Sequence, residues 1–334
     1  MTSTVAAVPL VSIGVPVFNG EELLARCLDS LLQQDYPNLE IVISDNGSTD
    51  GTPQIAKRYI RADSRVKYVR AEQNRGSAWN FNRVFELSSG EYFAWTAHDD
   101  ERGPSFVSAC VECLERHPDA VLSPGAVEVS IEPSDEIVYV TRFDSFASRT
   151  DVVDRYDEAL RRLTPLALYG MYRSSAIRKT RLLQPAIATD IAFIREVVVL
   201  GTIAPVSKVL MQYRARSTWS TIDQDARTYL GVARKPWWYL PFAVLFADQC
   251  SRLVHAPIPA GVKVRLGAVL VRHEARELVR KVVIKIAGAT CPERYKERLA
   301  RTLCRRWFTN PNVTVNREDV FFQRVCKPQL GWWR

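Results

Sequence analysis

The chain has 334 residues, of which 47% are hydrophobic, and it carries a net charge of +8. This hydrophobic content is ordinary for a folded protein and excludes wholesale disorder. The charge is uneven, because residues 1–205 hold 21 Lys and Arg against 28 Asp and Glu, whereas residues 206–334 hold 24 against 9. The basic second part predicts an anionic partner, such as a membrane surface, a nucleic acid or a phosphorylated substrate.

Targeting signals and cysteine usage predict a cytoplasmic protein. The N-terminal stretch MTSTVAAVPL lacks the basic and long apolar regions of a secretory signal. The chain has seven cysteines, an odd number without framework spacing, which predicts reduced thiols. Cys110 and Cys113 form a lone CxxC pair without neighbouring His ligands, and we interpret both as helix packing residues. Residues 236–247 are free of charge, but this stretch is too short to cross a bilayer.

Apolar strands alternate with amphipathic helices between residues 10 and 97. The pattern predicts strands at 10–18, 39–44, 66–70 and 91–97, and helices at 20–34, 52–60 and 77–87. Strands that are apolar throughout and separated by helices are typical of a mostly parallel sheet with helices on both faces. The predicted fold class is therefore α/β.

Polar stretches, three of which contain glycine, follow all four predicted strands. They are Phe18–Gly20, Ser44–Thr52, Glu72–Gly76 and 97–100. Each stretch alone is compatible with a turn or a helix cap. Ligands of parallel sheets bind beyond the carboxyl ends of the strands, so the four stretches together predict a ligand site on one edge. The adjacent Asp99 and Asp100 repel each other and predict a cation or a hydrogen-bond network beside them.

The order and spacing of these motifs resemble those of the family 2 glycosyltransferases of the GT-A fold. The matching segments are VSIGVPVFNGEELLARCLDSLLQQDYPNLEIVISDNGSTDGT, then NRG with NFN, then GEYFAWTAHDD. The resemblance covers about the first 130 residues and extends more weakly to about residue 215. It implies a nucleotide-diphospho-sugar donor, a divalent metal and a single displacement that inverts the sugar carbon.

The resemblance also implies a nucleotide-binding set. Asp45 matches the acid that recognises the nucleoside base, and Val17 and Phe18 match residues that line the same pocket. The nucleotide-side loop and the helix after it are matched by Asn74, Gly76 and Asn82.

The metal motif departs from the family pattern. His98, Asp99 and Asp100 fall where the family carries Asp-x-Asp, but the usual first acid is Ala97 here. The resemblance therefore leaves Asp99 to hold the metal, assisted by Asp100 or by the diphosphate itself. Mg²⁺ or Mn²⁺ suits such a site, because hard cations take one or two carboxylates together with phosphate oxygens and waters.

Catalytic and diphosphate-binding residues are implied further along the chain. Asp190, in IATDIAFIREVVVLG, matches the family's acidic position and is our candidate general base, with helix capping as the alternative. Arg214 and Arg216 match basic residues that face the diphosphate, or they belong to a solvated loop. Tyr169–Arg173 either lines the acceptor side or packs in the core.

Beyond residue 220 the resemblance fades, and two basic amphipathic helices are predicted at 261–288 and 292–308. The first carries an apolar stripe made of Val264, Ala268, Val271, Ala275, Leu278, Val279, Val282 and Ile286. Together with KPWW, PWWYLPF and the final GWWR, these helices predict a surface that lies on an anionic membrane. The alternative is that they pack on the catalytic domain. We therefore divide the chain into a catalytic region, 1–220, and a basic helical region, 221–334.

These features favour a glycosyltransferase that is peripheral on the inner face of the cell membrane and acts on a lipid-linked or cell-envelope acceptor. One alternative is a nucleotidyltransferase, although GVPVFNGEE offers no basic glycine-rich phosphate loop. The other is a non-catalytic binding or scaffold protein, which the missing acid at Ala97 supports. A nucleic-acid binder is disfavoured, because none of the arginine-rich helices is recognisable as a helix that reads bases.

Overall fold

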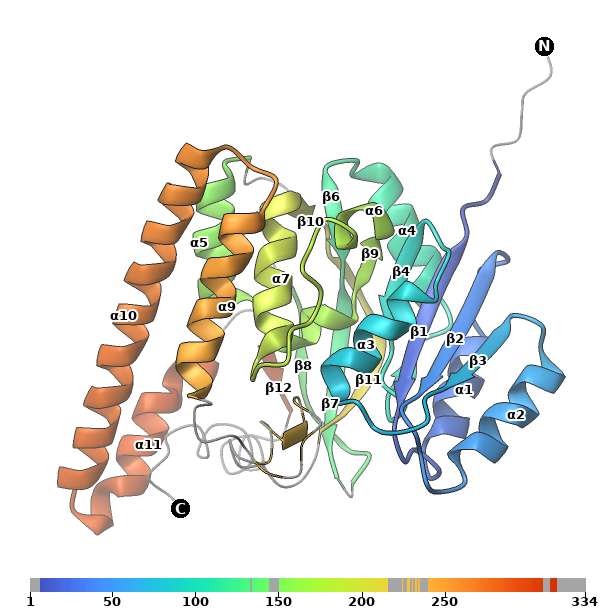
Figure 1. The fold of residues 1–334 in the computed structure, drawn as a ribbon. Coiled ribbons are helices and arrows are strands. Elements are labelled where there is room, and N and C mark those ends of the chain that lie inside the picture. The colour runs from blue at the N-terminus through green and yellow to red at the C-terminus, as the bar shows by residue number, and fades with distance from the viewer. Residues whose placement is uncertain are drawn as a thin grey trace.

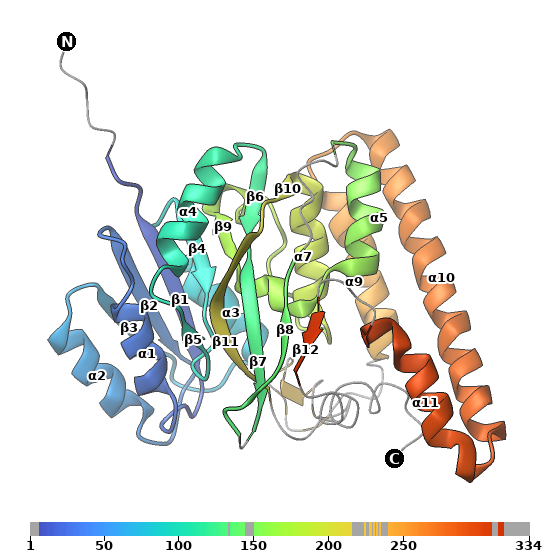
Figure 2. The same ribbon diagram turned by 180° about the vertical axis from the view of Figure 1, so that it is seen from behind.

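The computed structural model describes residues 7–132, 134–143, 150–215, 240–308 and 313–316, together with isolated positions between 224 and 234. Two β-sheets form the centre of the molecule, and helices cover them (Figure 1). The C-terminal helices lie along one side of the molecule, far from the first three strands (Figures 1 and 2).

The larger sheet has the strand order β10-β6-β9-β4-β1-β2-β3. Its strands are β1 (Val11–Val17), β2 (Leu39–Asp45), β3 (Val66–Arg70), β4 (Tyr92–Trp95), β6 (Ala120–Ser123), β9 (Met171–Arg173) and β10 (Thr202–Ile203). The first four strands run parallel, whereas β9 is antiparallel to both of its neighbours. Every residue of β1 and β2 is buried, as expected for the mostly apolar central strands of a parallel sheet. The four strands predicted from the sequence are confirmed.

Helices pack on both faces of this sheet. One core contains residues of α1 (Leu24–Leu32) and α4 (Phe106–Arg116), and the other contains residues of α3 (Ser77–Glu86), α6 (Ser174–Ile177) and α7 (Thr189–Leu200). Helix α2 (Thr52–Ala62) lies beside β3. The three helices predicted between residues 20 and 87 are thus present, with α1 beginning at Leu24. Cys110 is fully buried in α4 and the partly buried Cys113 packs against the same core, which confirms that both are packing residues.

A second sheet, which the sequence pattern did not predict, has the order β12-β8-β7-β11-β5. Its strands are β5 (Glu101–Arg102), β7 (Gly125–Ile131), β8 (Ile137–Thr141), β11 (Val206–Ala215) and β12 (Val313–Val315). Strand β5 begins directly after the acidic pair and is antiparallel to β11. This pairing brings residues 99–102 next to the end of β11, more than a hundred positions later in the chain.

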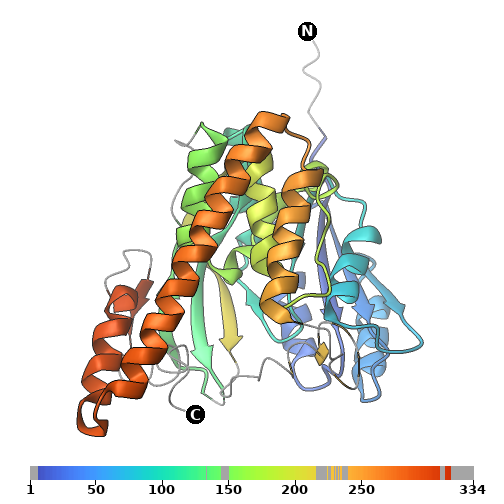
Figure 3. The same cartoon turned by 60° about the vertical axis from the view of Figure 1, so that its left-hand side comes forward.

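The C-terminal helices are α9 (Pro241–His255), α10 (Ala260–Thr290) and α11 (Glu293–Phe308), and the last two confirm the predicted helices. The first part of α10 packs on α9 and α5 (Val152–Arg162) through the buried Leu266, Val269 and Leu270. The short 3-10 helix η1 (Pro165–Tyr169) leads into β9. Figure 3 shows α10 crossing the whole body, with α11 beside its C-terminal end. Among the helices in the described part of the chain, none combines the length and apolarity that a membrane span requires.

Candidate active site

The carboxyl ends of β1 and β2 are held together by Asn80 of α3. Its side-chain nitrogen donates to the backbone oxygens of Val17, at 3.2 Å, and Ser44, at 3.0 Å, while its oxygen accepts from the Ser44 hydroxyl at 2.7 Å. This buried amide fixes the separation of two strand ends on the predicted ligand edge. Asn80 opens the quoted NFN motif, but the resemblance implied a role only for Asn82; a buried Asn inside an amphipathic helix requires polar partners of this kind.

Asp45, the predicted base-binding acid, is fully buried at the end of β2. Its carboxylate accepts hydrogen bonds from the backbone N–H of Ser48 and the hydroxyl of Tyr68, both at 2.8 Å, and Arg70 lies 3.4 Å away. Val17 is also buried, whereas Phe18 is exposed on the same edge. Both oxygens of Asp45 thus already have a polar partner, and the carboxylate is shielded from solvent.

The loop that contains Asn74 and Gly76 is attached to the end of β2 through Asn46. The Asn46 amide nitrogen donates to Oδ1 of Asn74 at 2.9 Å and to the Gly76 oxygen at 3.1 Å, and its oxygen accepts from the N–H of Arg75. Gly76 has φ of 89°, a left-handed conformation that favours glycine. Asn46 directly follows Asp45 in the quoted motif, so its position in the sequence was the available signal.

Asn82 does not face this edge. Its amide makes two hydrogen bonds to the backbone of Leu183, at 2.9 and 3.0 Å. The side chain therefore connects α3 to the segment that precedes α7.

The acidic pair lies beyond β4. Asp100 is only 1% exposed, and its Oδ1 accepts the backbone N–H of Arg214 at 3.2 Å, whereas its Oδ2 is buried without a hydrogen-bond partner. Burial raises the pKa of Asp100, and the neighbouring Asp99 raises it further. Asp99 itself is partly exposed.

A buried cation partly offsets this negative charge. The guanidinium of Arg102 donates to the Thr96 hydroxyl at 3.0 Å and to the Trp95 oxygen at 2.6 Å, and it lies over the ring of Phe106. Burial lowers the pKa of Arg102 to about 10, although the nearby Asp100 opposes this shift. Both of these Arg102 hydrogen bonds go to groups other than Asp100, whose Oδ2 has no hydrogen-bond partner.

The donor set of this pair fits a divalent cation that is held mainly by its substrate. In the described ranges no group of three or more His, Cys, Asp or Glu side chains is arranged to hold a metal. Asp99 and the orphaned oxygen of Asp100 therefore supply at most two carboxylates, which is the number that Mg²⁺ sites built on substrate phosphates use.

His98 lies between this pair and the loop after β1. A Cβ atom added to Gly20 would come within 2.6 Å of the His98 ring, so the ring packs directly on the Gly20 backbone. This close contact joins two of the four predicted polar stretches.

Arg214 reaches the acidic pair through its backbone, while its guanidinium pairs with Asp135, between β7 and β8. Asp135 and Glu101 also pair with Arg26. Asp99 lines a small pocket together with Arg26, Glu101, Asp135 and Arg214. Arg216 lies outside the described residues.

Asp190 lies in the first turn of α7, whose N-cap position is taken by Ala188 without a side-chain hydrogen bond. Its Oδ1 accepts the N–H of Ile191 at 2.8 Å, and burial raises its pKa. The neighbouring Thr189 could also cap this helix, but its hydroxyl accepts the N–H of Gln184. Neither side chain therefore occupies the capping position that the alternative interpretation required.

Two tyrosines connect Asp190 to the acidic pair. The rings of Tyr169 and Tyr213 lie 6.0 Å apart. The pKa of each hydroxyl is raised mainly by burial and further by the charges of Asp100, Asp99 and Asp190, so both tyrosines are influenced by all three carboxylates. Tyr169 belongs to a segment noted in the sequence, whereas nothing in the pattern pointed to Tyr213.

The sequence matches the model of the Glycosyl transferase family 2 over residues 12–179. This match spans half of the chain, including β1–β4, Asp45, the pair Asp99 and Asp100, and the Asn74 loop. The chain belongs to this family.

Other glycosyltransferases match over shorter stretches. An uncharacterized glycosyltransferase of Rickettsia typhi, RT0329, is 36% identical over 108 residues, which cover 32% of this chain and 33% of the relative. Glycosyltransferase GlyG of Streptococcus pneumoniae is 34% identical over 91 residues, or 27% of this chain and 30% of the relative. The matches thus span about a third of these relatives.

Solved structures confirm the GT-A fold. TarS residues 1–349 of S. aureus, in complex with UDP-GlcNAc, superpose with a TM-score of 0.60 at 17% identity, covering 86% of this chain and 77% of TarS. The mannosyltransferase PcManGT of Pyrobaculum calidifontis, in complex with GDP-Man and Mn²⁺, gives a TM-score of 0.50 at 16% identity, covering 98% and 88%.

Proposed function

We propose that this chain transfers a sugar from a nucleotide-diphospho-sugar to a hydroxyl acceptor with inversion at the sugar carbon. The observation that carries the proposal is the orphaned Asp100 oxygen beside Asp99, at the end of β4 and near Asp190. A buried carboxylate oxygen without a partner is costly unless a ligand completes it. Family membership supports the same conclusion.

Asp99 and Asp100 would hold a Mg²⁺ or Mn²⁺ ion together with the donor diphosphate. When bound, such an ion stabilises the negative charge that develops on the departing nucleoside diphosphate. The complex of PcManGT with GDP-Man and Mn²⁺ supports this choice. The nucleoside would lie along the edge formed by Phe18, Asp45 and the Asn74 loop.

Asp190 would act as the general base. Its carboxylate takes the proton of the acceptor hydroxyl while that oxygen bonds to the sugar carbon, and the bond from this carbon to the diphosphate oxygen breaks. A single displacement of this kind inverts the carbon. The raised pKa of Asp190 makes it a stronger base than an exposed Asp, and it lies on a helix that holds it in place.

The acceptor is proposed to be a lipid-linked or cell-envelope glycan that is reached from an anionic membrane. Beyond residue 270, α10 presents a contiguous apolar face whose side chains are 48–64% exposed: Leu278, Val279, Val282, Val283 and Ile286. The basic Arg276, Lys281 and Lys285 flank this face and are exposed. The rest of the protein packs against other residues of α10, so packing on the catalytic domain does not explain why these five side chains are apolar. An apolar face flanked by cations is typical of helices at an anionic lipid surface.

The membrane proposal is tested by vesicle flotation. Wild-type protein is expected to float with vesicles that contain anionic lipid, and less so as salt is raised. The double substitution Val279→Glu with Val283→Glu is expected to abolish flotation, whereas Val254→Glu, on an exposed valine of α9, is the matched control. Flotation that survives the double substitution would overturn the assignment of this face.

The catalytic proposal is tested by a donor screen. UDP-, GDP- and dTDP-sugars are incubated with the protein in Mn²⁺, in Mg²⁺ and in a chelator, and release of the nucleoside diphosphate is measured. Metal-dependent release from one donor is expected. No release from any donor, with or without added glycolipid acceptors, would favour the scaffold alternative that Ala97 suggests.

A further inference from the structure

The segment Arg181–Ala188, immediately before Asp190, has an unusual backbone. Leu182 and Ala188 have φ of 55° and 51°, and both are left-handed although neither is glycine. Such residues persist only where their surroundings determine the conformation, and they cluster at functional sites. Contacts from neighbouring elements must therefore hold this segment in place.

Helix α3 holds the middle of the segment through Asn82. The amide nitrogen donates to the Leu183 oxygen at 2.9 Å, and the amide oxygen accepts the Leu183 N–H at 3.0 Å. A single side chain thus satisfies both backbone groups of a residue that follows a left-handed turn. This pairing is specific to an amide, because a carboxylate cannot donate to the Leu183 oxygen.

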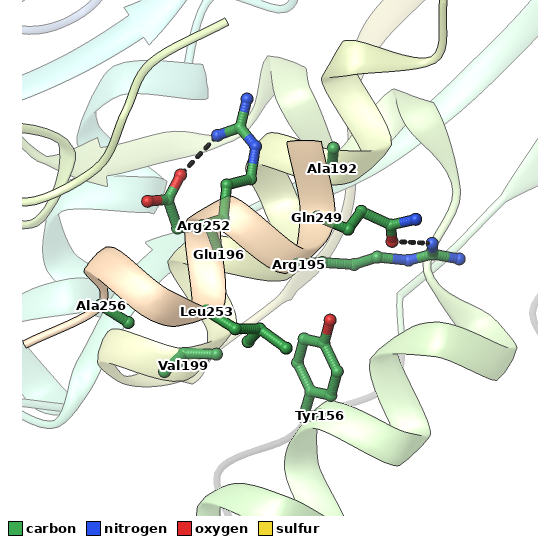
Figure 4. A pocket seen from close by; sticks show the side chains of 9 residues that line it. All are labelled: Tyr156, Ala192, Arg195, Glu196, Val199, Gln249, Arg252, Leu253 and Ala256. Carbon is green, nitrogen blue, oxygen red and sulfur yellow. Dashed lines mark hydrogen bonds and ion pairs between the residues drawn. The ribbon is translucent and has the colours of Figure 1, made fainter. Parts of the chain in front are cut away.

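Helix α9 holds the start of the segment through Arg252, which is only 2% exposed. Its guanidinium donates to the Leu182 oxygen at 2.8 Å and pairs with Glu196 of α7 and Asp248 of α9. Glu196 in turn accepts the backbone N–H of Arg181. Figure 4 shows Arg252 reaching across to Glu196, and Gln249 reaching across to Arg195, between the same two helices.

We propose that Asn82 and Arg252 are positioning residues for Asp190. Their bonds to Leu182 and Leu183 fix the first left-handed turn of the segment and thereby set where the carboxylate lies at the start of α7. Arg252 makes α9 part of the catalytic unit, although α9 follows the family match in sequence. This inference rests on the proposed role of Asp190 as the base.

A purely structural role is the competing explanation, because removing one partner from a buried ion pair destabilises a fold. Arg155 provides a matched control. It is a buried arginine that also donates to a backbone oxygen of α7, but at Val198, near the end opposite to Asp190. Arg155→Gln is expected to lower the melting temperature without lowering kcat.

The experiment compares Asn82→Ala, Arg252→Gln and Arg252→Lys with Arg155→Gln in full-length protein. We expect kcat to fall about 100-fold in Asn82→Ala and Arg252→Gln, the size of loss that a misplaced catalytic group causes. The donor KM should stay within about twofold, because the nucleotide edge is untouched. Arg252→Lys should recover part of the rate, since it keeps the charge that faces Glu196.

A double-mutant comparison separates this inference from the proposed function. Asn82→Ala should cause no further loss of kcat once Asp190 is Asn, because the positioned group is then absent. An Asp190→Asn protein that keeps wild-type kcat would overturn the role of Asp190 as base. If Asp190→Asn loses activity while Asn82→Ala keeps it, the positioning inference alone is overturned. If Arg252→Gln fails to fold, the kcat of Asn82→Ala still tests the positioning inference.

Discussion

The backbone N–H of Arg214 donates to Oδ1 of Asp100 at 3.2 Å, which joins β11 to the chain beyond β4. This bond uses one carboxylate oxygen and leaves the other buried without a partner. Because the bond comes from the backbone, the position of Asp100 does not depend on the Arg214 side chain.

The Arg214 guanidinium pairs with Asp135, a residue that is mostly exposed. If Arg214 also binds the diphosphate, the two anions compete for it. Arg214→Ala should therefore raise the donor KM about tenfold or more, as expected for losing a charge-assisted bond. Asp135→Asn should lower the donor KM, by about fivefold at most, because exposed pairs are weak. Steady-state kinetics at saturating acceptor measure both. If neither substitution changes the donor KM, Arg214 does not contribute to the donor site.

The pH dependence of turnover should report Asp190. A general base must be deprotonated, and burial raises the pKa of Asp190 above the ordinary Asp value of about 3.9. The rate should therefore fall on the acid side with a midpoint above that value. The Arg195 charge lowers this pKa, so Arg195→Gln should move the midpoint to higher pH. The measurement is a pH profile of kcat. An acid limb that stays in place in Arg195→Gln would argue against Asp190 as its origin.

Gly20→Ala should weaken donor binding. The added Cβ would lie 2.6 Å from the His98 ring and from a Val17 methyl group, so the ring has to move. Overpacking of this kind costs about 1–3 kcal/mol. We expect a higher donor KM and a lower melting temperature, compared with Gly261→Ala, where nothing lies within 4 Å of the added atom. Unchanged donor affinity would show that His98 does not contribute to the donor site.

Asn80→Ala should destabilise the fold. It would leave the Ser44 hydroxyl and two strand-end carbonyls without their present partner, and a buried polar group left unpaired costs about 1–3 kcal/mol. Urea unfolding measures this loss. Asn38→Ala, which removes an exposed amide bonded to the Val8 oxygen, is the control and should change stability by less. Equal stability losses in the two variants would contradict the role given to Asn80.

The first half of the fold was predictable because its signal is local. Strands such as Val11–Val17 are buried on both faces and therefore apolar throughout, and α1 repeats its buried positions with helical spacing. The way the second sheet reaches the acidic pair was not predictable, because β5 has two residues and pairs with β11 far along the chain. Strands this short leave no periodic pattern.

The candidate site was predictable where side chains follow strands directly, as Asp45, Asp99 and Asp100 do. Residues that only the tertiary fold brings to the acidic pair, such as Tyr213 and Arg102, could not be predicted. The direction in which a side chain points could not be predicted either. Asn82 belongs to a matching motif, yet its side chain contacts Leu183. Motif spacing identifies neighbours along the chain, whereas tertiary packing decides which way each side chain points.

The proposed reaction requires a divalent cation and a diphosphate to bind together at Asp99 and Asp100. Titration calorimetry with UDP and GDP, each with and without Mn²⁺, measures this directly. We expect Mn²⁺ to tighten binding of one nucleotide in wild-type protein and in the control Asp119→Asn, an exposed residue before β6. The tightening should disappear in the double substitution Asp99→Asn with Asp100→Asn. Metal-dependent nucleotide binding that persists in this double variant would contradict the account.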